Sequence, residues 1–345
     1  AETRRTLVRG GPIKRETPMK KAVLIPDSFK GTLSSTEICS IMKERIHTYY
    51  PGCEVVSIPV ADGGEGSVDA FLTAVGGEKI TLTVENPYFE PMKSFYGLID
   101  GGKTAVIEMA SCAGLPLVED RKDPRKTTTY GVGKLILAAA GRGISKLVVG
   151  LGGSATNDGG CGAAAAFGVR FYNKDGEEFA PTGGTLIDID RIDMSGRSSA
   201  LDGVEVVTMC DIDNPMYGPT GASHIFGPQK GADPAMVEEL DRGVVHLCEV
   251  IRRDLGMDLS EVPGGGAAGA MGAGMIAFFG SRLQMGIETV LDTVGFDQTI
   301  GDADLILTGE GKIDGQSLRG KVVIGVARRA AKQGKPVVAV VGGAD

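Results

Sequence analysis

A run of small and polar residues, GGSATNDGG at positions 152–160, is the part of this sequence best suited to chemistry. It follows a strand predicted at Lys146–Val149. Glycine lets the backbone approach a bound group closely because it carries no Cβ atom. Backbone N–H groups in such a loop, helped by the Ser154 and Thr156 hydroxyls, can bind phosphate or carboxylate. We therefore interpret 152–160 as an anion-binding loop.

Three further glycine-rich loops follow predicted strands in the same way. They read PDSFKG at 26–31, ADGGEGS at 61–67 and TGEGKIDGQS at 308–317, and a fifth cluster of Gly and Ala lies at 264–274. A tight turn would explain any one of these loops alone. Loops at the carboxyl ends of parallel strands, however, open into one crevice, where α/β proteins bind ligands. Several such loops in one chain therefore indicate a shared ligand site.

Ionisable residues near these loops are the candidate catalytic groups. Asp211 follows a strand predicted at Val204–Met209, so its carboxylate can hold Mg²⁺ or accept a hydroxyl proton. A turn before Pro215 explains the same residue without chemistry. Lys30 and Lys230 each precede a glycine, a setting from which a lysine can reach a phosphate. A plain surface position explains these lysines equally well.

Two nucleotide-binding motifs occur only in imperfect form. Gly150-x-Gly152-x-x-Ala155 fits the dinucleotide fingerprint, but helix-breaking residues follow it where the fingerprint requires a helix. Gly315-x-x-x-x-Gly320-Lys321 is similar to a P-loop, but Val322 replaces the hydroxyl residue that binds Mg²⁺. The first motif keeps an NAD-dependent hydroxy-acid dehydrogenase open as an alternative function.

The elements that would position these loops alternate between strand and helix at both ends of the chain. Strands are predicted at 22–25, 54–60, 304–307 and 337–341, and helices at 38–46, 68–75 and 322–332. This alternation is typical of a parallel α/β sheet. Short strands separated by turn residues at 78–110 predict hairpins instead.

The predicted fold class is therefore α/β, with two domains. One α/β domain would combine residues 19–84 with residues 290–345, and a mixed α/β domain would be inserted at 85–289. The cleft between the two domains would hold the chemistry.

Composition limits the choice of partners. Glycine accounts for 53 of the 345 residues, about twice its usual share of roughly 7%. The net charge of −8 argues against nucleic acid or an anionic membrane as the main partner. Six scattered cysteines predict neither a zinc site nor a disulfide framework, and they favour a cytoplasmic protein. Residues 1–18 are rich in Arg and Lys and are interpreted as a tag or linker.

Taken together, the loops resemble the bacterial type I glycerate kinase family. The resemblance is carried by the loops quoted above and by CDIDNP at 210–215 and FGPQKGA at 226–232, in order from Met19 onward. It implies ATP-dependent phosphorylation of D-glycerate with Mg²⁺ to give 2-phosphoglycerate. It also implies a flavodoxin-like domain built from both chain ends, and an inserted domain similar to restriction endonucleases.

Phosphoryl transfer needs positioning and charge neutralisation, so we expect the site residues to divide by these tasks. Asp211 would be the general base or a Mg²⁺ ligand, with Asp158 and Glu310 as other metal candidates. Lys30 and Lys230 would clamp the transferred phosphoryl group or the glycerate carboxylate. The ATP phosphates would bind Gly152, Gly153, Ser154, Thr156, Asn157, Gly159 and Gly160, and glycerate would bind Asp27, Ser28, Asp62, Gly63 and Gly64.

Two features separate this chain from the family pattern. The family usually continues beyond 337–345 with a further strand and helix, and residues 1–18 have no counterpart in it. A non-catalytic anion- or nucleotide-binding module is therefore the second alternative. The sequence leaves open whether the protein is a monomer or a homodimer.

Overall fold

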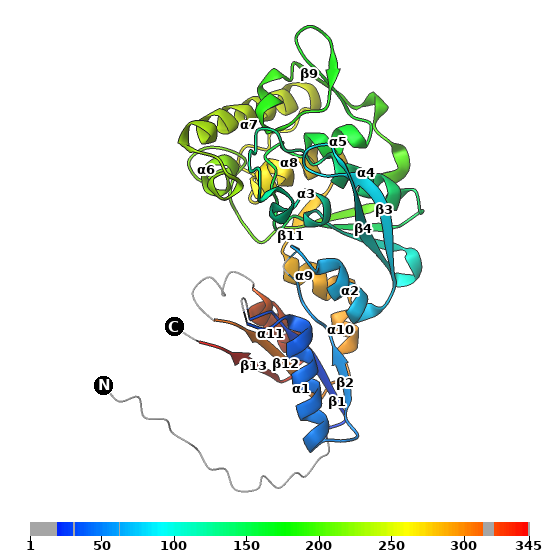
Figure 1. Cartoon of the computed structure of the whole chain (residues 1–345). Coiled ribbons are helices and arrows are strands. Elements are labelled where there is room, and N and C mark those ends of the chain that lie inside the picture. Colours follow the sequence, from blue (N-terminus) through cyan, green and yellow to red (C-terminus); the bar gives the residue numbers. More distant parts are fainter. Residues whose placement is uncertain (1–18, 30–31, 62, 313–320, 344–345) are drawn as a thin grey trace, which may run out of the picture.

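The computed structural model describes residues 19–29, 32–61, 63–312 and 321–343. The predicted tag or linker at 1–18 lies outside these residues. A four-stranded sheet occupies one end of the molecule in the order β13-β12-β1-β2, and all its pairings are parallel (Figure 1). The sheet unites both ends of the chain, as predicted. Its strands are β1 (Lys21–Pro26), β2 (Glu54–Ser57), β12 (Leu305–Glu310) and β13 (Val337–Val341).

A mixed six-stranded sheet, in the order β11-β10-β6-β5-β4-β3, forms the centre of the larger part. The first four of these strands are parallel, and β3, β4 and β5 make the two antiparallel pairings predicted for 78–110. Its strands are β3 (Glu78–Glu85), β4 (Pro91–Ile99), β5 (Thr104–Glu108), β6 (Lys146–Gly150), β10 (Glu205–Met209) and β11 (Arg282–Gln284). A small third sheet contains β7 (Arg170–Tyr172), β8 (Glu178–Phe179) and β9 (Arg191–Asp193).

Side chains cap the N-termini of the first helix and of the longest one. Ser34 and Glu37 form the capping box of the first helix, and Asp233 accepts a hydrogen bond from Met236 N at the start of the longest one. The helices are α1 (Ser35–Tyr49), α2 (Ser67–Val75), α3 (Ala110–Ala113), α4 (Tyr130–Ala140), α5 (Cys161–Ala166), α6 (Ala222–Phe226), α7 (Pro234–Leu255), α8 (Ala267–Phe279), α9 (Gly286–Thr293), α10 (Phe296–Thr299) and α11 (Val322–Lys332).

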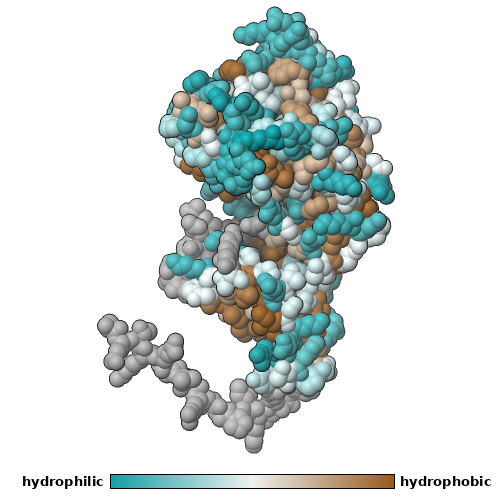
Figure 2. Space-filling model, viewed as in Figure 1, coloured by the Kyte–Doolittle hydropathy of each residue, from teal (hydrophilic) through white to brown (hydrophobic). Residues whose placement is uncertain are grey.

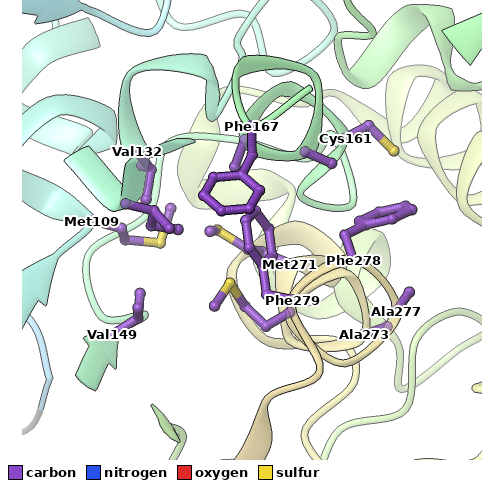
Figure 3. Packing of buried hydrophobic residues seen from close by; sticks show 14 of the residues in the cluster. Met109, Val132, Val149, Cys161, Phe167, Met271, Ala273, Ala277, Phe278 and Phe279 are labelled. Atoms are coloured by element: carbon purple, nitrogen blue, oxygen red, sulfur yellow. The ribbon is translucent and has the colours of Figure 1, made fainter. Parts of the chain in front are cut away.

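The largest core lies between the six-stranded sheet and the helices α4, α5, α7 and α8. Strand alternation sends Leu147 and Val149 of β6 into this core, while Val148 faces the other way. Phe167 and Phe279 pack edge to face with ring centroids 5.3 Å apart, and Figure 3 labels both of them near Met271. This core holds the strand ends of the large sheet in place.

A second core is shared by the two sheets. It contains Val148 from the large sheet, Val23 and Ile25 from the small sheet, and side chains of α2, α9, α10 and α11 between them. Figure 1 shows α2, α9 and α10 in this intermediate layer. In sequence, the strands of the large sheet begin at Glu78 and end at Gln284, whereas the predicted inserted domain runs from 85 to 289. That division into domains stays a prediction, as do the flavodoxin and restriction-endonuclease likenesses.

The outer face of the small sheet carries an apolar hollow of about 590 Å³ between α1 and strands β12 and β13. Figure 2 shows the corresponding brown surface at the small-sheet end of the molecule. Ile41, Tyr49 and Val340 lie on its rim and are exposed. Among the described helices, none combines the length and the apolar character needed to cross a membrane.

Two glycine-rich segments meet where the sheets come together. A Cβ atom on Gly150 would lie 2.3 Å from the carbonyl oxygen of Gly63, and one on Gly152 would lie 2.6 Å from Cα of Gly64. The N–H of Gly152 donates a hydrogen bond of 3.0 Å to Gly63 O. The two backbones can approach this closely only because the residues in contact are glycines, which carry no Cβ atom.

Gly150→Ala should therefore lower the free energy of unfolding by about 3 kcal/mol, because the methyl group must displace backbone rather than a flexible side chain. Chemical denaturation measures this change. Gly52→Ala is the matched control, because a Cβ atom there meets nothing within 4 Å. Equal stability of the two variants would show that the contact between the glycine segments is not tight.

Candidate active site

The parallel strands of the large sheet end side by side, so the residues after them share one edge. Gly150 at the end of β6 is paired with Met209 at the end of β10 and with Glu108 at the end of β5. The chain then continues into the predicted loop 152–160 after β6, and into Cys210 and Asp211 after β10. The edge therefore gathers the predicted loop and the predicted catalytic carboxylate, which is the arrangement expected of α/β ligand sites.

A cavity of about 230 Å³ opens at this edge. Its polar lining comes from Ser154, Asp211, Gln229 and Lys230. The other lining residues are Leu151, Gly152, Gly153, Met209, Cys210, Ile212, Phe226, Ala267 and Ala268. Of the residues predicted to bind phosphate, the structure brings Gly152, Gly153 and Ser154 to the cavity wall.

The backbone of this loop offers few donors to the cavity. Gly152 N donates to Gly63 O, Ala155 N to Ala113 O, and Thr156 N to the Ser154 hydroxyl. Within the described residues, the structure gives the N–H groups of Gly153 and Ser154 no acceptor. Gly153 is exposed and has φ of 74°, a left-handed conformation that glycine adopts without strain. An anion in the cavity would therefore meet the main chain at Gly153 and Ser154.

The second half of the loop is turned inward and supports the first. Thr156, Asn157 and Asp158 are fully buried. The Thr127 hydroxyl donates to Ala155 O at 3.0 Å, and Asn157 Nδ2 donates to the Ser223 hydroxyl at 3.2 Å. Gly159 N donates to Gly269 O at 2.9 Å. Gly159 and Gly160, also predicted to bind phosphate, are buried with this inner half.

Asp158 lies at the centre of this support. Its Oδ2 accepts hydrogen bonds from Thr129 N at 2.7 Å and from the Thr129 hydroxyl at 2.9 Å. Gly160 N and Gly162 N donate to the same carboxylate, each at 3.2 Å. Burial raises the pKa of Asp158, and these hydrogen bonds oppose the rise. The carboxylate thus faces protein N–H and O–H groups rather than the cavity, which leaves its predicted role as a metal ligand without geometric support.

Lys230 is the most deeply buried charged group at the cavity, with 2% of its surface exposed. It ends the short 3₁₀ turn Pro228–Lys230, and its Nζ donates to Thr156 O at 2.6 Å. Burial lowers the pKa of Lys230 to about 7, although the charge of Asp158 acts in the opposite direction. Its ammonium group is therefore directed at the loop backbone.

Asp211 joins the cavity to the start of α9. Its Oδ1 accepts a hydrogen bond of 2.7 Å from Gly286 N, the first residue of that helix. The residue is exposed and lines the cavity. The hydrogen bond orients the carboxylate, and helix N-termini favour negative charge. Asp211 is thus a fixed, accessible carboxylate beside Ser154.

The small sheet contributes its own carboxyl edge. Pro26 at the end of β1 pairs with Gly309 in β12, so the predicted residues Asp27 and Ser28 follow beside Glu310. Glu310 is buried and lies 3.8 Å from the Lys321 ammonium. Gly63 and Gly64 contact the Gly150–Gly152 backbone, which brings this predicted substrate loop to the large-sheet edge. Lys30 and Asp62 lie outside the described residues.

Several residues of the site were not singled out from the sequence. Buried Glu108 accepts a hydrogen bond of 2.9 Å from Val68 N near the start of α2, and burial raises its pKa. Gln229 and Ala268 line the cavity, and Ala268 has φ of 54°. Position could have indicated Glu108, because it ends an apolar strand of the same sheet. Ala268 belongs to the Gly and Ala cluster noted at 264–274, but its left-handed conformation was not indicated, because alanine rarely adopts it.

Comparison with known proteins decides the family. Residues 22–345 match the glycerate kinase family. The chain belongs to the glycerate kinase family. It is 44% identical to glycerate 2-kinase of Escherichia coli K12. The aligned region of 323 residues covers 93% of this chain and 85% of the relative. A glycerate kinase of Bacillus cereus is 46% identical over the same shares of both chains.

The fold agrees with this assignment. A crystal structure from Salmonella typhimurium LT2, presented as a candidate glycerate kinase 2, superposes with a TM-score of 0.88 at 41% identity. The match covers 94% of this chain and 87% of the other. The resemblance seen in the sequence is therefore confirmed, and the chain is a glycerate kinase rather than the alternative NAD-dependent dehydrogenase.

The buried position of Asp158 leads to a direct test. Asp158→Asn should lower the free energy of unfolding by about 2–4 kcal/mol, because the new amide group would oppose buried N–H donors. Thermal or chemical denaturation measures the loss. Asp175→Asn, in an exposed hairpin, is the control and should leave stability unchanged. If Asp158→Asn folds normally and only its Mg²⁺ requirement rises, the carboxylate is a metal ligand after all.

Proposed function

We propose that this glycerate kinase transfers the γ-phosphoryl group of ATP to D-glycerate and forms 2-phosphoglycerate. Membership of the family supports the reaction class, and the name of the Escherichia coli relative supports position 2 of the acceptor. The six cysteines, all free thiols, support a location in the cytoplasm, since disulfides form in oxidising compartments.

The phosphate-binding part of the proposal rests on the cavity beside Gly153 and Ser154. Their N–H groups and the Ser154 hydroxyl are donors suited to phosphate oxygens. The cavity of about 230 Å³ is smaller than pockets that enclose whole drug-sized ligands, roughly 300–1,000 Å³. The phosphoryl end of ATP would enter it, and the adenosine part would extend beyond the cavity.

Asp211 is the proposed base, because its carboxylate lines the cavity and its Oδ1 is held by Gly286 N. It would accept the proton of the glycerate hydroxyl as the phosphoryl group is transferred. Asp27, Ser28, Gly63 and Gly64 would bind glycerate from the small-sheet side, together with Asp62. Lys30 would clamp the phosphoryl group.

The donor set also fits Mg²⁺, which usually binds one or two carboxylates together with substrate phosphates. Asp211 would hold the ion from the cavity side, with Glu310 as the second candidate. In the described residues, no three or more His, Cys, Asp or Glu side chains gather into a metal cluster. When bound, Mg²⁺ would neutralise charge on the phosphates.

A coupled assay tests the reaction. ADP release should depend on D-glycerate, and phosphorus NMR of the product should show the phosphate on O2. A phosphate on O3 would reject the proposed position. Binding of ATP without turnover would instead support the alternative of a non-catalytic nucleotide-binding module.

Asp211→Asn should lower kcat by roughly 10²–10⁴-fold, because the amide cannot accept the hydroxyl proton. Steady-state kinetics and a melting curve together measure this. Asp193→Asn is a matched control: Asp193 also accepts a backbone N–H, from Ser195 at 2.8 Å, in the separate β7–β9 sheet. Near-normal turnover of Asp211→Asn would remove Asp211 from catalysis.

A further inference from the structure

Lys230 holds an unusual position for a lysine. Its side chain is buried, and across the described residues no carboxylate lies within ion-pair distance of its Nζ. Burying an ammonium group without such a partner is costly, and an apolar residue of similar size would avoid that cost. The hydrogen bond from its Nζ to Thr156 O, at 2.6 Å, joins the 3₁₀ turn before α7 to the inner half of the 152–160 loop.

The groups around the Lys230 ammonium are the apolar lining of the cavity and two carboxylates, Asp158 and Asp211. The apolar side chains of Leu151, Met209, Ile212 and Phe226 line the same cavity. Asp158 is the opposite charge that acts on Lys230 from the loop, but its oxygens already accept hydrogen bonds from Thr129, Gly160 and Gly162. Asp211 lines the cavity from the end of β10.

We propose that Lys230 is a positioning residue. Its buried ammonium group fixes the Thr156 carbonyl, and it thereby sets the affinity of the 152–160 loop for the phosphates of the nucleotide. This proposal rests on the proposed function. The sequence predicted that Lys230 would clamp the phosphoryl group or the glycerate carboxylate directly. The geometry points to an indirect role, because the Nζ donates to the loop backbone.

The proposal has a definite pH dependence. At a pH below its pKa of about 7, the Lys230 side chain is an ammonium group. Its positive charge then favours the binding of an anion in the cavity. As the pH rises through that value the free enzyme loses the charge, so affinity for ATP should fall. The affinity for D-glycerate should not fall in the same way, because the proposed glycerate site lies at the small-sheet loop and not beside Lys230.

The experiment compares wild type with Lys230→Met and Lys230→Arg from about pH 6 to about pH 8.5, a range around the pKa of Lys230. KM for ATP, KM for D-glycerate and kcat are measured, together with equilibrium binding of ATP alone. The nucleotide's own protonation cancels in the ratio of variant to wild type. Lys174→Met, in an exposed hairpin, is the control for loss of one positive charge.

Relative to Lys230→Met, the wild-type affinity for ATP should fall roughly tenfold across this range, as expected for the loss of one charge at a low-dielectric site. At the upper end the ratio of the two Kd values should approach one. The ratio of the Kd values of Lys230→Arg and Lys230→Met should stay constant and favour the arginine variant, since arginine stays charged. Melting curves identify a variant that fails to fold. In that case, the pH dependence of ATP binding by wild type and by the other variant still tests the proposal.

Two results would overturn the proposal in distinguishable ways. If Lys230→Met and wild type show the same pH profile and the same Kd for ATP, Lys230 has no role in nucleotide binding, and the kinase function stands. If Lys230→Met instead raises KM for D-glycerate and leaves ATP binding unchanged, the loop holds the acid, and the proposed phosphate site itself is wrong.

Discussion

The close contact of Gly63 and Gly64 with Gly150 and Gly152 is the constraint on which the site depends. A Cβ atom on Gly150 or Gly152 would lie within 2.6 Å of backbone atoms across this contact. The contact joins a loop of the small sheet to the carboxyl edge of the large one. The apolar core that the two sheets share, which contains Val148 and Val23, packs them against each other. The proposed acid and nucleotide sites are thereby brought together.

The inner half of the 152–160 loop, which we propose binds phosphate, is anchored by polar groups. Asp158 accepts N–H and O–H donors from Thr129, Gly160 and Gly162, while Lys230 holds the carbonyl of Thr156. Phosphoryl transfer depends on donors that are in place before the reaction, since reorganisation during the reaction raises the barrier. The inner residues of the loop therefore support it, while the N–H groups of Gly153 and Ser154 are the ones that would bind a ligand.

The sequence predicted the elements, and the strand ends at which the loops lie, better than the direction of individual side chains. The alternation of strands and helices at both ends of the chain indicated the parallel sheet, and Asp211 could be placed at a strand end. Polar residues in a glycine-rich loop suggest exposure, so the burial of Thr156 and Asp158 was not foreseen. Lys230 was expected at the surface or on a phosphate, because only tertiary packing decides that a lysine beside glycine is buried.

A crystal structure with Mg²⁺, D-glycerate and a non-hydrolysable ATP analogue tests the central claim most directly. The account predicts phosphate oxygens within hydrogen-bond distance of Gly153 N and Ser154 N, and the glycerate hydroxyl facing the carboxylate of Asp211. Phosphates bound only along the small-sheet edge near Asp27 and Glu310, with the cavity beside Ser154 empty, would contradict it.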